Sequence, residues 1–343
     1  MRNNKMPVGQ PTLVEGDESG IIDILKDDSK FSFIEVDVSC PHNIKAPLLT
    51  TKIKTNGVVK TIAPVGEWSN VYTSIEILKA IELGYKFKFH RAVYFDAKII
   101  FDEYVDYYYN IKKNSAKNSS SYTISKLLLN SLYGRFGMSP YLDKHEIINS
   151  EDIIFKSLNN NISSVHNLDN NKDLISYQSS NEIDFSNTYC NIAIAACVTA
   201  GARTYMSYFK NMENFTLYYS DTDSIDIDKP LPKEYVGNEL GQFKLEHIFD
   251  EAVYLGPQMY GGKTNDYELI RIKGLKNPIH FIELKELLNS NLSIKKPNLK
   301  LYSSLTNSNI FIRDDIYILT ITDSKRELIF QNNKFVDTKP IVL

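Results

Sequence analysis

The segment Tyr218-Tyr219-Ser220-Asp221-Thr222-Asp223-Ser224 decides the fold expected for this chain. Apolar, β-prone residues precede it at 215–217, and Ser224-Ile225-Asp226-Ile227 alternates polar and apolar side chains after it. The stretch therefore predicts two short strands joined by a tight acidic turn. Asp221 and Asp223 stand one residue apart at this turn, and such a carboxylate pair favours a hard divalent cation with oxygen ligands.

A solvated acidic turn explains a lone Asp-x-Asp equally well, so the turn by itself leaves both interpretations open. An EF-hand loop is excluded. With Asp221 at its first position, Ile225 stands where a ligand belongs and Asp226 stands where glycine is needed. A second motif, upstream in the chain, favours the metal site.

Length and composition limit the kinds of fold and function that this chain can have. The 343 residues suffice for two or three subdomains around a real core. With 39 Lys and Arg against 42 Asp and Glu, any nucleic-acid contact must come from local clusters rather than overall charge. Cys40, Cys190 and Cys197 form no C-x-x-C pair, which fits a reducing compartment without structural zinc. We expect Cys190 and Cys197 to be core residues of one helix.

No apolar run approaches the roughly 20 residues that span a bilayer, so we expect no membrane partner. The N-terminus lacks the apolar core of a signal peptide and the Arg-rich amphipathic character of a transit peptide. Asn, Ile, Lys and Tyr are abundant while Arg is scarce. This bias is typical of an AT-rich gene and indicates an organellar or plasmid genome, with mitochondrial localisation and no transit peptide.

The first 138 residues predict a strand-rich region followed by two helices. Residues 6–11 read as a turn-rich lead-in without helical period. The expected elements are a strand at 31–38, a helix at 69–85, a strand at 87–95, and a helix at 96–110. A basic tip with Lys112, Lys113 and Lys117 joins this helix to a second one, forming an antiparallel pair.

The second half of the chain is predicted less sharply. Residues 139–185 are rich in Asn and Ser, with β-like pieces at 153–155 and 174–177, and indicate an insertion or flexible subdomain. A helix at 189–209, a strand at 267–273, a helix at 279–288, and strands at 309–312 and 315–321 follow. Gly256 to Lys263 nearly spells a phosphate-binding loop, but its first glycine is one residue early and a strand follows, so we reject that function.

One face of the second helix gathers polar residues and glycines. At about 100° per residue, this face carries Lys126, Asn130, Tyr133, Gly134 and Gly137. Gly costs about 1 kcal/mol in a helix interior. The glycine at 134 therefore indicates either a close approach to the backbone or the end of the helix.

Two further groups of residues complete this pattern. Apolar Ile124, Leu128 and Leu132 are expected on the opposite side of the second helix. In the helix predicted at 189–209, Arg203 lies one turn beyond Thr199, on a face of Ala and Gly that lets a backbone pass nearby.

These motifs resemble those of a known family. Lys126-Leu-Leu-Leu-Asn130-Ser131-Leu132-Tyr133-Gly134 resembles the K-x-x-x-N-S-x-Y-G fingers motif of family B DNA polymerases, and Tyr219 to Ser224 resembles their Y-x-D-T-D-S palm motif. Thr199-Ala-Gly-Ala202-Arg203 is similar to the T-x-x-A/G-R primer-template element that lies between them. Residues 6–11, 35–49 and 66–85 are similar to the protein-primed branch carried by linear mitochondrial plasmids.

The resemblance implies an α+β fold: a polymerase right hand of palm, fingers and thumb that lacks the exonuclease domain and part of the palm. The implied division is a partial palm with a terminal-protein-region-like insertion at 1–95, a fingers helix pair at 96–138, an Asn-rich insertion at 139–185, a palm with the catalytic hairpin at 186–270, and a thumb-like subdomain at 271–343.

The resemblance also implies a DNA-directed DNA polymerase that transfers nucleotides by a two-metal mechanism. Asp223 would be the direct metal ligand, and Asp221 would support metal and primer terminus. The implied cofactor is two Mg²⁺ ions, with Mn²⁺ as the alternative. The implied partners are primer-template DNA, deoxynucleoside triphosphates and a terminal priming protein, in replication of a mitochondrial plasmid or plasmid-derived element.

Further roles follow from the same resemblance. Lys126 would neutralise triphosphate charge, with Asn130 on the same face. Tyr133 would pack against the incoming nucleotide, and Gly134 would leave room for the templating base. The implied DNA-binding residues, which position the duplex without reading its sequence, are Thr199, Arg203, Tyr260 and Lys273.

The sequence departs from the family at two motifs. The D-x-x-S-L-Y-P motif, which supplies the second metal-binding Asp, is not found, and Asp37-Val-Ser-Cys-Pro41 echoes it without the Leu-Tyr pair. In the family that motif precedes an M-P-V-G stretch, which begins here at Met6, so we expect the chain to start just after it. The K-x-Y element near the primer terminus reads Gln258-Met259-Tyr260.

Losing a charge-stabilising group of this kind typically costs more than about 100-fold in rate. We therefore expect residues 1–343 alone to extend a primer poorly. A catalytically defective remnant that at most binds primer-template DNA is the alternative, and the DNA upstream of Met1 discriminates the two. A reverse transcriptase is disfavoured because Thr222 separates the two aspartates. A non-enzymatic metal-binding module leaves the face of Lys126 unexplained.

Overall fold

The computed structural model describes residues 1–55, 57–139, 143–168, 170–179, 189–275, 279–289, 292–304, 309–322 and 325–343. The chain divides into two compact units, each described here by itself. Unit 1 comprises Met1–Leu129, Ala196–Ile294 and Ile318–Leu343, and unit 2 comprises Asn130–Ala195 and Lys295–Tyr317. The five-part division expected from the sequence stays a prediction.

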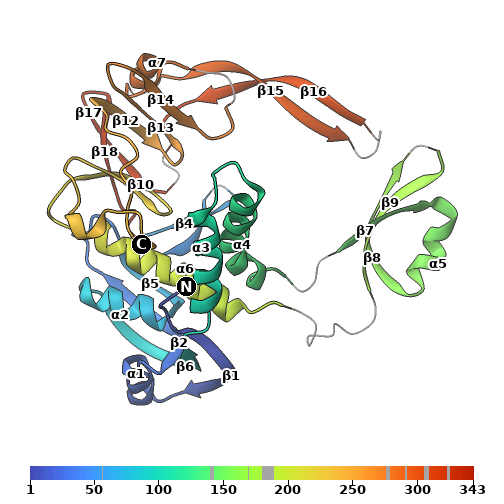
Figure 1. Ribbon diagram of the computed structural model, residues 1–343, viewed down its shortest axis with the longest axis horizontal. Coiled ribbons are helices and arrows are strands. Elements are labelled where there is room, and N and C mark those ends of the chain that lie inside the picture. The colour runs from blue at the N-terminus through green and yellow to red at the C-terminus, as the bar shows by residue number, and fades with distance from the viewer. Residues whose placement is uncertain are drawn as a thin grey trace. The chain divides into compact units, whose positions relative to one another are not determined.

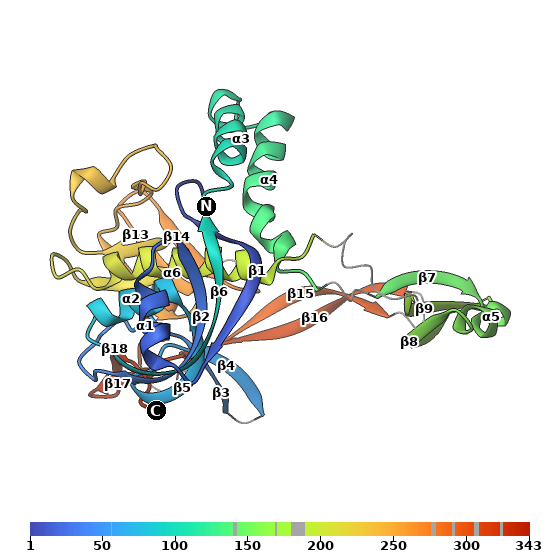
Figure 2. The same cartoon turned by 90° about the horizontal axis from the view of Figure 1, so that it is seen from below.

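A four-stranded antiparallel sheet forms the base of unit 1 (Figures 1 and 2). Its spatial order is β1 (Met6–Glu15), β6 (Lys86–Lys98), β2 (Lys30–Cys40) and β5 (Gly66–Thr73). Helices α1 (Glu18–Lys26) and α2 (Ser74–Glu82) pack against one face. The strands expected at 31–38 and 87–95 are confirmed as β2 and β6.

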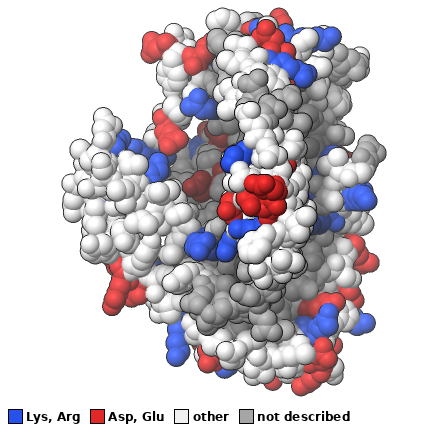
Figure 3. All heavy atoms as spheres, turned by 90° about the vertical axis from the view of Figure 1, so that its right-hand side faces the viewer, with Lys and Arg blue, Asp and Glu red and all other residues white. Residues whose placement is uncertain are grey.

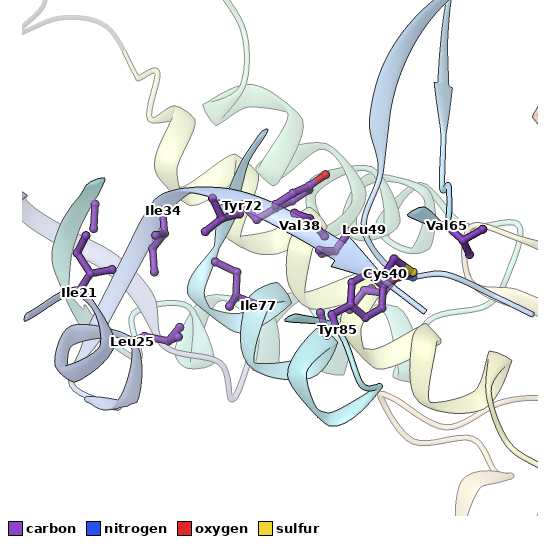
Figure 4. Packing of buried hydrophobic residues seen from close by; sticks show 14 residues of the cluster. Ile21, Leu25, Ile34, Val38, Cys40, Leu49, Val65, Tyr72, Ile77 and Tyr85 are labelled. Atoms are coloured by element: carbon purple, nitrogen blue, oxygen red, sulfur yellow. Dashed lines mark hydrogen bonds between the residues drawn. The ribbon is translucent and has the colours of Figure 1, made fainter. Parts of the chain in front are cut away.

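The core of this unit lies between the sheet and the two helices, as Figure 4 shows. Along β2 the buried residues Ile34, Val36 and Val38 alternate with side chains on the opposite face of the sheet. From the helices, Ile21 and Ile77 pack against them with no exposed surface. Full burial of each such side chain contributes about 1.5–3 kcal/mol, so this cluster fixes both helices to the sheet.

The expectation of a turn-rich lead-in at 6–11 is wrong, because these residues begin strand β1. The strand lies at the edge of the sheet and its register shifts between Val8 and Thr12. Gly9, in the left-handed region with φ of +79°, lies within this irregularity. An edge position and a bulge are where a sheet tolerates proline, and this explains how Pro7 and Pro11 fit.

The helix expected at 69–85 is wrong in its first part. Strand β5 continues to Thr73, and α2 starts there with a capping box. The Thr73 hydroxyl accepts a hydrogen bond from the Glu76 amide, and the Glu76 carboxylate accepts one from the Thr73 amide. Such reciprocal bonds satisfy two otherwise unpaired amides at a helix start. Cross-strand pairing with β2 then holds residues 66–73 in the sheet.

The helix pair follows the sheet as α3 (Asp102–Asn114) and α4 (Ser120–Phe136). The first helix starts later than the expected residue 96, because β6 runs to Lys98. Helix α6 (Ile192–Lys210) corresponds to the helix expected at 189–209, and Cys197 is buried in it. Cys190 precedes the helix and is half-buried, so its expected place in a helical core is wrong.

The rest of unit 1 consists of short sheets and one helix. Strands β3 (Thr51–Thr55) and β4 (Val58–Ile62) form a hairpin. The remaining elements are β10 (Leu217–Asp221), β11 (Ser224–Ile227), β12 (Glu251–Gly256), β13 (Met259–Lys263), β14 (Glu268–Ile272), α7 (Phe281–Glu286), β17 (Glu327–Gln331) and β18 (Lys334–Lys339), with a 3-10 turn at Lys233–Tyr235. The segment from Gly256 to Lys263, which resembles a phosphate-binding loop in sequence, lies in the β12–β13 hairpin. This confirms that it does not form such a loop.

The last three residues pair with the start of β5. The Leu343 amide donates to the Val65 carbonyl at 3.0 Å, and the Val65 amide donates to the Ile341 carbonyl at 3.0 Å. Gly66 has a φ of +102°, and a Cβ there would lie 2.2 Å from the Leu343 carbonyl oxygen. Glycine is therefore required at this position for both conformation and space.

Unit 2 contains a three-stranded antiparallel sheet in the order β7-β9-β8 and a long hairpin. Its elements are β7 (Lys144–Asn149), a 3-10 turn (Ser150–Asp152), α5 (Ile153–Ser157), β8 (Asn160–Leu168), β9 (Lys172–Ser179), β15 (Ile294–Ser304) and β16 (Asn309–Leu319). The β-like piece expected at 153–155 is wrong, because it forms α5. The two strands expected at 309–312 and 315–321 are one strand, β16.

Charged side chains of both signs are interspersed on the face shown in Figure 3. This distribution agrees with a net charge of −3 and means that an anionic partner would meet local groups rather than a broad basic field. Among the described helices, none is both long and apolar enough to cross a membrane.

Candidate functional site

The acidic motif forms the predicted hairpin in unit 1. Strand β10 pairs with β11 so that Tyr219 lies opposite Asp226 and Asp221 lies opposite Ser224. Only two residues connect the strands, and the first of them, Thr222, has a φ of +51°. A positive φ at this position belongs to the primed turns that match the twist of a hairpin, although it is unusual for a β-branched residue.

Hydrogen bonds within the turn hold Asp221. The Thr222 hydroxyl donates to its carboxylate at 3.0 Å, and the Ser224 hydroxyl donates to its backbone carbonyl at 3.1 Å. The Asp223 side chain is exposed and makes no hydrogen bond or ion pair within the described ranges. The turn therefore presents one anchored and one free carboxylate.

These two carboxylates fit a divalent cation in part. Within the described part of the chain, no three His, Cys, Asp or Glu side chains gather closely enough to hold a metal ion. Mg²⁺ usually takes one or two protein carboxylates and completes its shell with water and substrate phosphates. The hairpin thus supplies an incomplete set of oxygen ligands of the right chemistry.

Two charged residues that the sequence patterns did not single out lie near the hairpin. Burial lowers the pKa of Lys210 at the end of α6, and the nearby Asp221 carboxylate opposes this shift. Burial also raises the pKa of the half-buried Asp226 carboxyl, which accepts a hydrogen bond from the Tyr254 hydroxyl. Only the fold reveals Lys210, whereas Asp226 lies in the second strand of the predicted hairpin, three residues after Asp223.

Tyrosine rings pack beside the hairpin. Tyr219 stacks on Tyr254 with ring centroids 5.5 Å apart and planes 14° apart, and its centroid lies 4.9 Å from that of Tyr260. Aromatic pairs of this kind are worth about 0.5–1.5 kcal/mol beyond their buried area. The cluster joins β10 to the sheet of β12, β13 and β14, and it places the predicted DNA-binding residue Tyr260 next to the acidic motif.

The turn between β12 and β13 is also tied to the hairpin. The Gln258 amide donates to the Tyr219 hydroxyl at 2.8 Å, and the Lys273 amide donates to the Gln258 carbonyl at 3.0 Å. Gln258 has a φ of +57°. The backbone thus fixes the position at which the sequence lacks the expected lysine, and it brings Lys273 to the same turn.

The polar face predicted on α4 is exposed. Lys126, Asn130 and Tyr133 lie on the helix surface, and none of them makes a side-chain hydrogen bond or ion pair with another described residue. The predicted apolar face is confirmed only in part, because Leu128 and Leu132 are half-buried while Ile124 is 55% exposed. Ser125 is buried instead.

Gly134 lies inside the last turn of α4, which ends at Phe136. Among the described residues, a Cβ added at this residue would have no atom within 4 Å apart from its chain neighbours and the adjacent helix backbone. The chain's own packing therefore does not require glycine here, and neither does the helix end. Gly137 lies just beyond the helix, where a Cβ would come within 3.3 Å of Ala195 Cβ.

The two predicted contacts on α6 differ in their surroundings. The Thr199 hydroxyl donates to the Ala196 carbonyl of its own helix at 2.9 Å. Arg203 forms an ion pair with Glu76, its Nε and Nη2 each 2.8 Å from Oε1. This pair joins the start of α2 to the middle of α6, and no sequence pattern predicted it.

The basic tip of the helix pair is less positive than its sequence indicates. Lys113 pairs with Glu239 at 2.8 Å, and the Tyr109 hydroxyl donates to the Asn238 carbonyl at 2.9 Å. Lys112 and Lys117 are left as the uncompensated cations of the tip within the described residues.

Comparison with known proteins identifies the family. The profile described as DNA polymerase type B, organellar and viral, matches residues 1–215 of the 343. The chain belongs to this polymerase family. The probable DNA polymerase of Ascobolus immersus is 34% identical over 346 residues, covering 98% of this chain and 28% of that protein. The probable DNA polymerase of Neurospora intermedia is 34% identical over 322 residues, covering 92% and 33%.

The fold of this type B polymerase chain is similar to that of phi29 DNA polymerase solved with primer-template DNA and incoming nucleotide. The TM-score is 0.64 at 17% sequence identity, over 93% of this chain and 55% of that one. The α+β class and a partial polymerase right hand are thereby confirmed. The chain spans about a third or less of the length of the two fungal relatives.

Proposed function

We propose that this chain is the part of a protein-primed type B DNA polymerase that binds primer-template DNA and the incoming nucleotide. The observation that carries this proposal is the acidic hairpin, whose free Asp223 carboxylate and anchored Asp221 lie beside the cluster containing Tyr219 and Tyr260. The family membership and the fold support it. The exposed Lys126 of α4, which makes no side-chain hydrogen bond or ion pair with another described residue, supplies a cation for the nucleotide phosphates.

Each side chain has a defined task in this proposal. Asp223 and Asp221 hold Mg²⁺ or Mn²⁺, which when bound supplies charge neutralisation at the triphosphate and activation of the primer oxygen. Lys126 neutralises phosphate charge, and Asn130 lies one turn further along the same face. Tyr133 packs against the nucleotide, and the open space at Gly134 receives the templating base.

The remaining predicted residues hold the duplex. Thr199, Arg203, Tyr260 and Lys273 contact the primer-template backbone, which positions DNA without reading its sequence. A terminal priming protein and replication of a mitochondrial plasmid or plasmid-derived element belong to the same proposal. The similarity to fungal relatives and an amino-acid bias typical of an AT-rich gene support them.

Primer binding and extension test the proposal. Purified residues 1–343 should bind a primed duplex, extend it slowly with Mn²⁺, and lose extension but not folding in the Asp223→Asn variant. The slow rate is expected because the printed residues contain no D-x-x-S-L-Y-P motif. Binding without any extension would favour the DNA-binding remnant. Equal binding of primed DNA and an unrelated polyanion would overturn the proposal.

A further inference from the structure

Arg203 is held by a buried carboxylate rather than left free on its helix. Its Nε and Nη2 each lie 2.8 Å from Oε1 of Glu76, whose side chain is 4% exposed. We propose that Glu76 is a positioning residue that orients the Arg203 guanidinium toward a phosphate of the primer-template backbone. The inference rests on the proposed function and adds to it a residue to which the sequence motifs assigned no role.

The surroundings of Glu76 leave its carboxylate one orientation. Its Oε2 accepts the Thr73 hydroxyl at 2.7 Å and the Thr73 amide at 3.4 Å, while Oε1 takes both contacts from Arg203. Each carboxylate oxygen therefore has partners. A buried charge is tolerated only when it is paired and hydrogen-bonded in this way. The start of α2 therefore fixes the position of the Glu76 carboxylate.

The other half of the contact stays open. The Arg203 side chain is 40% exposed, and Glu76 accepts from two of its three nitrogens. A guanidinium carries five N–H donors in a rigid planar fork that matches phosphate geometry. Fixing one edge of this fork by Glu76 directs the remaining donors outward, and less rotamer freedom is lost when a phosphate binds.

Glu76 could also act on Arg203 in the opposite way, by neutralising its positive charge. A carboxylate beside an arginine also cancels its charge, and a guanidinium that is merely neutralised would bind phosphate more tightly once released. Positioning and neutralisation therefore predict changes of opposite sign when the Glu76 charge is removed.

The test measures the dissociation constant of primer-template DNA between 50 and 200 mM salt, a range over which phosphate contacts change affinity strongly. Glu76→Gln removes the charge but keeps a side chain that completes a capping box. It should weaken binding by up to about tenfold, because the guanidinium then loses its rotamer freedom only when the phosphate binds. Its salt slope should stay unchanged, because the cation remains. Arg203→Ala should weaken binding and lower the slope by about 0.9, as for one lost phosphate contact.

Two further variants sharpen the result. Glu35→Gln disrupts a comparable pair with Arg91 on the exposed face of the sheet and should leave binding unchanged. Arg203→Lys keeps the charge but loses the fork, so it should weaken binding at an unchanged slope. If thermal unfolding shows that Glu76→Gln does not fold, Arg203→Lys tests whether the oriented guanidinium is needed for DNA binding.

The possible outcomes separate the two claims. Tighter binding by Glu76→Gln, or unchanged binding by Arg203→Lys, overturns the positioning role while the proposed function stands. Unchanged binding by Arg203→Ala overturns the positioning role together with the DNA contact proposed for Arg203. Wild-type protein that binds no primed duplex overturns the proposed function, and the positioning role with it.

Discussion

Replacing Gly134 by alanine should stabilise the protein and impair its function at the same time. The residue lies in the last turn of α4, where a Cβ would meet no described atom within 4 Å beyond its chain neighbours and the adjacent helix backbone. The helix gains the difference in propensity between Gly and Ala, about 1 kcal/mol. For cooperative unfolding of all 343 residues, with an entropy of roughly 2.1 cal/mol/K per residue, this raises the Tm by about 1–2 °C.

The functional effect has the opposite sign because the proposed site places the templating base where the new methyl group would lie. A displacement of about 1 Å at a reacting complex can cost about 100-fold in rate. The assay measures how much the next complementary nucleotide tightens binding of a primed duplex, alongside thermal unfolding followed by circular dichroism. Gly134→Ala should raise the Tm and lose most of this tightening.

Ser121→Ala is the matched control, because Ser121 is exposed in the first turn of the same helix and away from the polar face. It should leave the tightening intact. The reasoning would be refuted if Gly134→Ala lowered the Tm, which would reveal unrecognised packing, or if it bound the nucleotide as well as the wild type.

Three other predictions concern particular buried or constrained groups. The Ser220 hydroxyl is buried without a hydrogen-bond partner in the described structure, a state that costs about 1–3 kcal/mol, so Ser220→Ala should raise the denaturant midpoint; a lower midpoint contradicts this. Burial raises the pKa of Cys197 from 9.0 to about 12, so iodoacetamide at pH 8 should label the half-buried Cys190 first. Equal labelling of both cysteines would refute this order of reactivity. The folded protein retains the Cys197 thiol proton more tightly than the unfolded chain, so the contribution of this thiol to the free energy of unfolding is complete below pH 9 and is lost as the pH rises toward 12. Gly66→Ala should release residues 341–343 to carboxypeptidase, and full resistance would count against it.

The acidic hairpin and the helices that carry the recognised motifs could be predicted because local pattern and tertiary context agree there. Residues 217–227 alternate as two strands around a turn, and the structure keeps that arrangement. The helix predicted from 189 matches α6 closely. In both segments the apolar spacing alone sets the element type.

The misassigned segments are those in which tertiary pairing decides between local options. Residues 69–73 are included in the predicted helix, but they lie in the segment 66–73, which eight registered pairs with β2 hold as a strand. The Thr73 and Glu76 capping box was the one local signal that could have located the helix start. Residues 6–11 contain two prolines that argue against a strand in general, and only an edge position beside β6 accommodates them.

The site could be predicted only where it follows a motif. Asp221, Asp223 and Lys126 stand in recognisable patterns, whereas Glu76 and Lys210 do not. Both of these residues reach their neighbourhoods through chain packing. Single-sequence patterns carry no information on such long-range contacts, and this is where the structure adds most to the candidate site.

The main proposal is that Asp223 of the acidic hairpin and Lys126, both in unit 1, take part in recognising a nucleotide chosen by the template. The most direct measurement is the affinity for a primed duplex with Mn²⁺ and either the complementary or a non-complementary deoxynucleoside triphosphate. We expect that only the complementary nucleotide tightens binding, and that Asp223→Asn and Lys126→Ala each abolish the effect while Glu35→Gln preserves it. Equal tightening by both nucleotides, or an effect that survives both substitutions, would contradict it.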